Sequence, residues 1–220
     1  MIPFELYSIT PSVPYYGHIF CIPNYYTPLE LDTIVAYRDS EHAWGNGITG
    51  TIPHDSYPNY TSPKWPLYEL NLDGKQTHIG SEKTMWLYEN WDDVRRITES
   101  GGMTKHDYYK DNQPIGWSEQ LRGNPPLSRP YPNHDDYGSR KLLTILVPLC
   151  DMGDPTRFNG IRGESPTWSL PWEMNRAYMF RPSRRSIHSY VNTMDMNRWV
   201  VNVNVVGDTG NATKANPSNR

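Results

Sequence analysis

The second half of the chain is built from short runs in which apolar and polar residues alternate. In RWVVNVNV, residues 198–205, Trp199 and three valines take the odd positions. Arg198, Asn202 and Asn204 take even positions together with one valine. Since successive strand residues face opposite sides, this pattern predicts a strand with one apolar face on a core and one polar face turned toward an interior. A polar barrel interior is typical of a ligand site.

Further strand-like segments, each bounded by turn residues, precede this run from about residue 114 onward. They are IGWSEQLRG (115–123), RKLLTILVPLC (140–150), PTWSLPWE (166–173), NRAYMFRP (175–182) and SIHSYVN (186–192). The chain also contains 20 Pro and 16 Gly, which interrupt helices and favour turns. We therefore expect a mainly β fold, an antiparallel sandwich or small barrel, whose core spans about residues 114–206.

The first part of the chain has a more helical pattern. Residues 17–40 combine a short strand, a Pro/Asn turn and a helix, in which Thr27 has the N-cap position and Pro28 the first helical position. The apolar stripe of this helix is expected to comprise Leu29, Leu31, Ile34 and Val35.

A second helix is predicted at about residues 88–99, followed by Gly101 and Gly102, which end it. Residues 41–80 are rich in Gly, Pro, Asn, Tyr and Trp, which predicts loops and short edge strands. We expect residues 1–206 to form a single domain with flanking helices, and residues 207–220 to form a flexible tail.

Composition narrows the class of protein. Only 36% of the 220 residues are hydrophobic, but 16 Tyr and 8 Trp supply large amphipathic side chains that suit a sheet with a half-polar interior. The net charge of −3 gives no global basic field for nucleic acid. Cys21 and Cys150 are too few for a disulfide framework, and no segment has the pattern of a signal peptide or membrane span. We expect a soluble, cytoplasmic protein with no nucleic-acid or membrane partner.

Positive charge gathers in one region. Residues 129–198 carry ten Lys/Arg against seven Asp/Glu, whereas residues 1–128 carry nine against sixteen. Nine of the ten cations are arginines, whose guanidinium group forms forked bonds with carboxylates and phosphates. Each position taken alone is also compatible with ordinary surface solvation.

One His–Asp pair has a spacing that suits a metal. In the stretch YPNHDDYG, His134 and Asp136 are two positions apart, so on a strand their side chains face the same way, while Asp135 faces the other. His188 follows 52 positions after Asp136, and Arg198 comes ten positions later. Two His and one carboxylate on a strand framework form the facial arrangement that binds non-haem Fe(II) and leaves coordination positions open.

This set of residues resembles the motif of the 2-oxoglutarate/Fe(II)-dependent dioxygenases. HDDYGSRKLLTILVPLCD is similar to their prolyl-hydroxylase-like branch, and NRAYMFRPSRRSIHSYVN is similar to the strand that leads to the distal His. FCIPNYYTPLELDTIVAY resembles the opening strand, turn and first helix of that branch. The sequence departs from it at Asn159 and Gly160, where the branch has a glycine pair with an acidic residue. The resemblance implies a double-stranded β-helix, a jelly-roll or cupin-like fold, with N-terminal helices packed on its major sheet.

The resemblance also implies roles for individual residues. The catalytic metal ligands for Fe(II) would be His134, Asp136 and His188. Arg198 would bind the C5 carboxylate of 2-oxoglutarate, which is oxidised to succinate and CO2 while O2 hydroxylates a C–H bond of the substrate. Ascorbate is expected to stimulate turnover. Further candidates for contacts with the co-substrate are Tyr131, Asn202 and Asn204.

The motifs do not define the substrate, and other classes of protein stay open. A prolyl or other peptidyl hydroxylase is the first expectation and a hydroxylase of a free amino acid or metabolite the second, since residues 40–112 match no pattern of the family. A zinc hydrolase would also use two His and one carboxylate. A helical His–Asp phosphohydrolase is opposed by Pro130 and Pro132. The remaining alternatives are a local hydrogen bond between His134 and Asp136 in a turn, and a barrel that binds a ligand without catalysis.

Overall fold

The computed structural model describes residues 2–9, 19–39, 60–61, 81–99, 113–124, 126–136, 141–159, 166–183 and 186–207. The strands are β1 (Tyr7–Ile9), β2 (Ile19–Ile22), β3 (Tyr60–Thr61), β4 (Pro114–Asn124), β5 (Ser128–His134), β6 (Lys141–Pro148), β7 (Arg157–Asn159), β8 (Pro166–Ser169), β9 (Ala177–Phe180), β10 (His188–Asn192) and β11 (Arg198–Gly207). The helices are α1 (Pro28–Asp39), α3 (Glu82–Glu89) and α4 (Trp91–Glu99).

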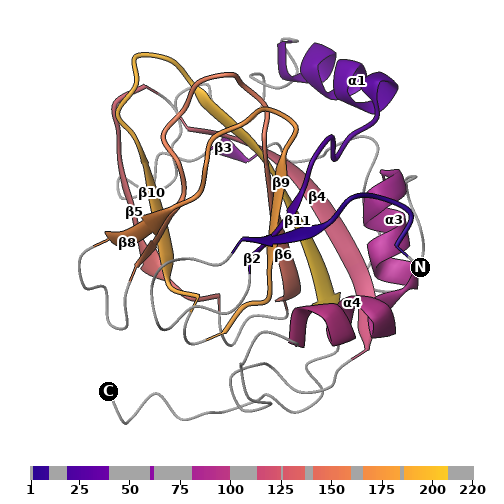
Figure 1. Cartoon of the computed structure of the whole chain (residues 1–220). Helices are drawn as coiled ribbons and strands as arrows, with labels where there is room; N and C mark the ends of the chain where they lie inside the picture. Colours follow the sequence, from indigo (N-terminus) through magenta and orange to yellow (C-terminus); the bar gives the residue numbers. More distant parts are fainter. Residues whose placement is uncertain are drawn as a thin grey trace, which may run out of the picture.

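The strands form two antiparallel sheets (Figure 1). The larger sheet has seven strands in the order β1-β2-β9-β6-β11-β4-β3, and the smaller has four in the order β5-β10-β7-β8. Helices α3 and α4 lie beside β4, on the side of the larger sheet that faces away from the smaller one. The structure therefore confirms a mainly β, antiparallel architecture with helices packed on one side.

Strand β11 lies inside the larger sheet, between β4 and β6, and its two faces differ as predicted. Trp199 and the valines at alternate positions after it belong to the hydrophobic core that also contains helix residues. Arg198, Val200 and Asn202 line a cavity on the opposite face. One strand thus separates an apolar layer from a polar one.

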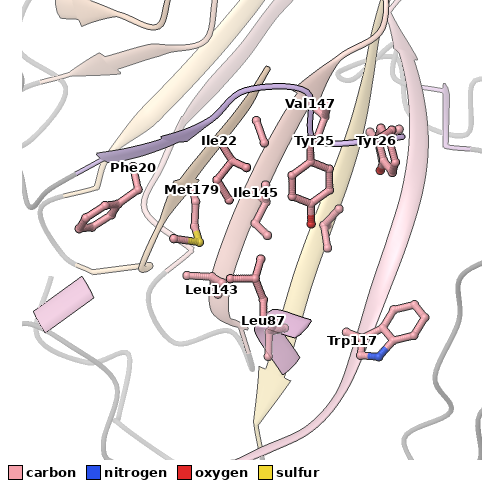
Figure 2. Packing of buried hydrophobic residues seen from close by; sticks show 14 of the residues in the cluster. Phe20, Ile22, Tyr25, Tyr26, Leu87, Trp117, Leu143, Ile145, Val147 and Met179 are labelled. Carbon is pink, nitrogen blue, oxygen red and sulfur yellow. The ribbon is translucent and has the colours of Figure 1, made fainter. Parts of the chain in front are cut away.

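The main hydrophobic core fills the space between the larger sheet and the helices. Figure 2 shows Leu143, Ile145 and Val147 in a row along β6, and the same cluster includes Tyr25 and the α3 residue Leu87. These side chains are almost completely buried. Burial of each such aliphatic or aromatic side chain stabilises the fold by about 1.5–3 kcal/mol.

Glu119 of β4 is a carboxyl group buried on this apolar side of the sheet. It accepts hydrogen bonds from the hydroxyl groups of Ser81 (2.9 Å), Thr84 and Tyr26 (3.3 Å). Ser81 is also the N-cap of α3, because its side chain accepts a bond from the backbone N–H of Thr84. The network fastens the start of α3 to the larger sheet. Burial raises the pKa of Glu119 to about 7.

Helix α1 begins as predicted. The Thr27 hydroxyl accepts a bond from the Glu30 N–H (3.3 Å) and the Glu30 carboxylate accepts one from the Thr27 N–H (2.8 Å), which is a capping box. Ile34 is fully buried, but Leu29 is 78% exposed. The predicted place of Leu29 on the apolar stripe is wrong, because five residues at about 100° each turn it roughly 140° away from Ile34.

The helix predicted at about 88–99 corresponds to α4, whereas α3 lies almost wholly before this range and is not predicted by the sequence. The N–H and the side-chain amide of Asn90 both donate to the Trp86 carbonyl at 2.9 Å. The Asn90 carbonyl in turn accepts bonds from the N–H groups of Asp93 and Val94. Asn90 therefore ends α3 and starts α4, and an apolar pattern does not reveal this double role.

The structure also bears on the predicted edge strand, the C-terminal segment, the two cysteines and the possibility of a membrane-spanning helix. Strand β3 pairs with β4 at the edge of the larger sheet, as expected for an edge strand in the region 41–80, the rest of which lies outside the described residues. Gly207, the first residue of the predicted tail, is the last of β11, and residues 208–220 also lie outside. Cys21 and Cys150 are free thiols. None of the helices in the described part is long and apolar enough to cross a membrane.

Candidate active site

Three side chains of the predicted metal motif converge at one end of the smaller sheet. His134 is the last residue of β5 and His188 the first of β10, and these two residues face each other in the antiparallel pairing. Asp136 follows β5 by two positions. One ligand atom from each of the three lies within 4.8 Å of the others. The fold therefore joins segments that are 52 positions apart in the chain.

Asp136 reaches this place by a turn and not by strand alternation. Strand β5 ends at His134, and Asp136 has a left-handed backbone with φ of 53°. Asp tolerates this conformation better than most residues. The predicted placement of His134 and Asp136 on one strand face is therefore wrong in its geometry, although the two side chains do meet.

The tautomer of His188 is fixed by its surroundings. Its Nδ1 lies 2.8 Å from the Ser186 carbonyl oxygen, which can only accept, so Nδ1 carries the proton and Nε2 carries a lone pair. Burial, followed by the neighbouring His134, lowers the pKa of His188 to about 4, so the ring is neutral at physiological pH. Metal-binding histidines commonly donate their second nitrogen to a carbonyl in this way.

The His188 lone pair faces another acceptor. Nε2 of His188 lies 3.9 Å from Oδ2 of Asp136, and Nε2 of His134 lies 3.9 Å from Oδ1 of the same carboxylate. These separations are too long for hydrogen bonds. Electron-pair donors that surround one point at this spacing suit a cation between them, so the residues present fit a metal with a two-His, one-carboxylate set.

Asp136 also contacts a lysine. Lys141 at the start of β6 donates from Nζ to Oδ2 of Asp136 at 2.8 Å. Burial opposes ionisation of the carboxyl group, but the Lys141 ammonium and the two imidazoles outweigh it and hold the pKa of Asp136 below its usual value. Asp136 is therefore ionised at neutral pH.

A cavity of about 130 Å³ extends from these residues between the two sheets. This volume has room for a ligand larger than one water molecule. Six of the polar side chains that line it are His134, Asp136, Lys141, His188, Arg198 and Asn202. The predicted metal ligands and the predicted co-substrate arginine thus share one cavity.

Arg198 is buried and rigidly held. Its Nε donates to the Asp154 carbonyl (2.8 Å), and its two terminal nitrogens donate to Asn124 Oδ1 (3.2 Å) and Thr156 Oγ1 (2.9 Å). The guanidinium also lies between the rings of Trp172 and Tyr190, at 4.8 and 4.7 Å from their centroids. The contacts are all neutral, so the positive charge has no ionic partner among the described residues.

The charge of Arg198 persists at neutral pH. Burial lowers the pKa of its guanidinium to about 10, which still leaves it protonated. Three of the five N–H donors are used by the contacts above, and each terminal nitrogen keeps one more. A buried cation with two remaining donors is suited to a carboxylate ligand.

The other predicted co-substrate residues are placed differently. Asn202 lines the cavity, and its buried Oδ1 has no hydrogen-bond partner among the described residues. Asn204 is buried one step further along β11 and accepts a bond from the Thr144 hydroxyl (3.3 Å). Tyr131 is paired with Tyr190 in the β5–β10 register, and its side chain lies outside the described part. The roles of these residues stay predictions.

Several residues of the site are not predicted by the sequence. Asn124 and Thr156 hold Arg198 from positions 74 and 42 residues away, and nothing in the local pattern marks them. The sequence distinguishes Lys141 only weakly, as the one lysine among the ten Lys and Arg residues of 129–198.

The chain was compared with known proteins at three levels. No family model and no curated protein matches it. Solved structures do match. A prolyl hydroxylase from Trichoplax adhaerens, in complex with a peptide from the oxygen degradation domain of hypoxia inducible factor, has 14% identity and a TM-score of 0.54, over 86% of this chain and 83% of that one. A prolyl-4-hydroxylase from Pseudomonas putida has 11% identity and a TM-score of 0.51, over 87% and 93%.

A third match is a viral collagen prolyl hydroxylase from Paramecium Bursaria Chlorella virus-1 in complex with 2OG. It has 14% identity and a TM-score of 0.46, over 86% of this chain and 96% of that one. The two higher-scoring structures show that the chain has the fold of prolyl hydroxylases. The predicted resemblance to that branch is thus confirmed at the level of fold.

Proposed function

We propose that the protein is an Fe(II)- and 2-oxoglutarate-dependent oxygenase that hydroxylates a C–H bond of its substrate. The observation that carries the proposal is the lone pair of His188 facing the Asp136 carboxylate at 3.9 Å beside His134. The two sheets around this point would form the double-stranded β-helix of a single domain spanning residues 1–206. Fold likeness to prolyl hydroxylases supports this reading.

The residues have separate tasks in this proposal. His134, Asp136 and His188 would hold Fe(II) at the edge of the cavity. The iron, when bound, supplies activation of O2 coupled to decarboxylation of 2-oxoglutarate to succinate and CO2, and ascorbate would keep it reduced. The Ser186 carbonyl fixes the tautomer of His188, so this ligand needs no proton transfer before it binds a metal.

Arg198 would bind the C5 carboxylate of 2-oxoglutarate. The contacts from Asn124, Asp154 and Thr156 hold its planar fork in one orientation before a ligand arrives, which reduces the entropy lost on binding. Asn202 offers a further polar contact from the cavity wall. Tyr131 and Asn204 remain weaker candidates for the same co-substrate.

The substrate is proposed to be a peptide, with proline as the first residue to test. Support comes from the fold likeness to two prolyl hydroxylases, one of them solved with a peptide. A free amino acid or another metabolite is the second candidate. Hydroxylation would be seen as a mass increase of one oxygen atom in peptides or metabolites incubated with the protein.

The direct test is turnover of the co-substrate. Purified protein is mixed with Fe(II), ascorbate and 2-oxoglutarate, and succinate is measured. His134→Ala and His188→Ala should each lower metal-dependent succinate formation at least about 100-fold. Arg96→Ala, an exposed residue of α4, is the matched control and should leave it unchanged. Absence of both metal-dependent turnover and 2-oxoglutarate binding in the wild-type protein would refute the proposal.

A barrel that binds without catalysis predicts a different result. The anaerobic absorption band of Fe(II) with 2-oxoglutarate requires only the chelate. Appearance of this band without succinate formation, with or without candidate peptides, would favour the binding protein over the enzyme.

A further inference from the structure

We propose that Lys141 is a positioning residue that holds one oxygen of Asp136 and leaves only the other for a metal. This inference rests on the proposed function and adds to it a reason why the carboxylate takes a single coordination position.

A β-bulge turns Lys141 into the cavity. Leu143 pairs with Val205, but Lys141 pairs with Val206, so two steps along β6 oppose one step along β11. In a regular strand Lys141 and Leu143 would share a face, and Leu143 lies in the hydrophobic core. The extra residue, Leu142, lets both leucines enter the core while Lys141 lines the cavity. Bulges next to active sites commonly redirect one side chain in this way.

Once redirected, the Lys141 ammonium binds one oxygen of Asp136. Nζ of Lys141 lies 2.8 Å from Oδ2, which also lies 3.9 Å from Nε2 of His188, while Oδ1 lies 3.9 Å from Nε2 of His134. The two oxygens are thus equally distant from one imidazole each, and the ammonium group distinguishes them. Both partners are shielded, with side-chain exposures of 22% and 12%, so solvent screens the contact only partly. The bond also stabilises the left-handed turn that brings Asp136 to the two histidines.

The number of open coordination positions follows from this contact. Two imidazoles and one carboxylate oxygen leave three positions of an octahedral metal, and 2-oxoglutarate and O2 need all three. If Lys141 did not hold Oδ2, the carboxylate could chelate the metal through both oxygens and take one of these positions. Lys141 prevents this by occupying Oδ2.

The test counts the waters on bound Mn(II), which requires no turnover. Line broadening of the Mn(II) electron paramagnetic resonance signal in water enriched in oxygen-17 gives their number. In the absence of 2-oxoglutarate, Lys141→Met should hold one water fewer than the wild-type protein, because both Asp136 oxygens then bind. Lys141→Arg keeps a donor and should match the wild-type count. Lys83→Met makes the same change at a lysine that contacts Asn24 and Tyr25, and should also match it.

A second readout follows the co-substrate. The affinity of Fe(II)-loaded Lys141→Met for 2-oxoglutarate, titrated by the anaerobic absorption band, should fall about tenfold, while Mn(II) binds at least as tightly as before. An unchanged water count in Lys141→Met overturns the inference. So does loss of Mn(II) binding, because the lysine then builds the site and does not select an oxygen.

Two controls separate the possible failures. If Lys141→Met does not fold, judged by its unfolding temperature, Lys141→Leu, which also lacks a donor, is measured with the same expected outcomes. If the wild-type protein binds no Mn(II), the proposed function fails together with the inference. If the wild-type protein binds Mn(II) with a normal site and only the Lys141 variants behave unexpectedly, the inference alone fails.

Discussion

Two shielded carboxyl groups lie on opposite sides of the larger sheet and differ in pKa: Asp136 follows β5 and meets Lys141 of β6 on the cavity side, and Glu119 of β4 lies on the helix side. Toward the cavity, the pKa of Asp136 lies below its usual value, since Lys141 and two imidazoles outweigh the effect of burial. Toward the helices, Glu119 has a pKa raised to about 7 by burial. Both are largely shielded from solvent, so burial alone does not decide the charge.

The partners of the two groups explain the difference. Asp136 has an ammonium group at 2.8 Å, whereas Glu119 has three hydroxyl groups. Hydroxyl dipoles lower the pKa of a buried carboxyl group, but less than desolvation raises it. A buried carboxyl group beside an ammonium group stays ionised and can bind a metal, whereas one beside hydroxyl groups alone takes up a proton more readily and serves packing.

The largest effect is expected for a substitution on the cavity side of β11, which should lower the affinity for 2-oxoglutarate. Arg198→Met should weaken 2-oxoglutarate binding about 100- to 1,000-fold, or about 3–4 kcal/mol, because it removes the charge and both remaining donors. Anaerobic titration of the Fe(II) absorption band measures this. Mn(II) affinity should be unchanged, because Arg198 does not contact the metal residues. A co-substrate affinity within threefold of the wild-type value would contradict the assignment.

The next largest effect is a pH dependence of the free energy of unfolding that arises from Glu119. The unfolded carboxyl group has a pKa near 4.5 and the folded one near 7, so the folded state binds the proton more tightly. Protonated Glu119 therefore contributes to the free energy of unfolding. This contribution is complete below pH 4.5 and is lost as the pH rises through 7, so that about 3 kcal/mol has been lost at pH 8. Glu119→Gln removes this dependence.

Urea unfolding at several pH values tests the Glu119 prediction. Relative to the wild-type protein, Glu119→Gln should gain about 3 kcal/mol of unfolding free energy between pH 4.5 and pH 8. Parallel pH profiles for the two proteins would show that Glu119 does not titrate in this window.

A smaller effect is expected from the apolar side of β11. Val203→Ala should lower the free energy of unfolding by about 2 kcal/mol, because Val203 is fully buried in the main core. Its affinity for 2-oxoglutarate should stay within about twofold of wild type, since the side chain faces away from the cavity. A loss of affinity comparable to that of Arg198→Met would remove the distinction between the two faces.

The smallest effect tests where the apolar layer ends. Leu29→Ala on α1 should change stability by less than about 0.5 kcal/mol, because the side chain is 78% exposed. Ile34→Ala on the same helix should cost about 3 kcal/mol. Thermal unfolding of the two variants compares them directly, and equal losses would mean that Leu29 is buried by a partner in solution.

Regular patterns made part of this structure predictable. The period of two in residues 198–205 was sufficient to orient β11, because each side chain of a regular strand follows from its neighbour. The spacing of His134, Asp136 and His188 anticipated three side chains that the fold brings together. Thr27 likewise marked the start of α1.

Irregular features were not predictable in the same way. The bulge at Leu142 places the Lys141 side chain on the opposite face of β6. Strand alternation cannot predict this, because the inserted residue shifts the period of two. The left-handed turn at Asp136 departs from the extended conformation on which the strand prediction relied, and an Asp residue permits such a turn without requiring it. Asn124 reaches Arg198 through the pairing of β4 with β11, and Thr156 reaches it from the segment that precedes β7. Much of the geometry of the candidate site therefore arises where the regular strand pattern is interrupted.

The stacking of Arg198 on Trp172 has a practical consequence. The guanidinium lies 4.8 Å from the centroid of the indole ring, so an anion that binds the cation changes the electric field at a fluorophore. The Trp172 emission should therefore shift when 2-oxoglutarate enters, and the difference between the wild-type protein and Trp172→Phe would isolate this signal from the other tryptophans. Trp172 would thus serve as an intrinsic optical sensor of the proposed co-substrate, which requires no label and no catalytic turnover.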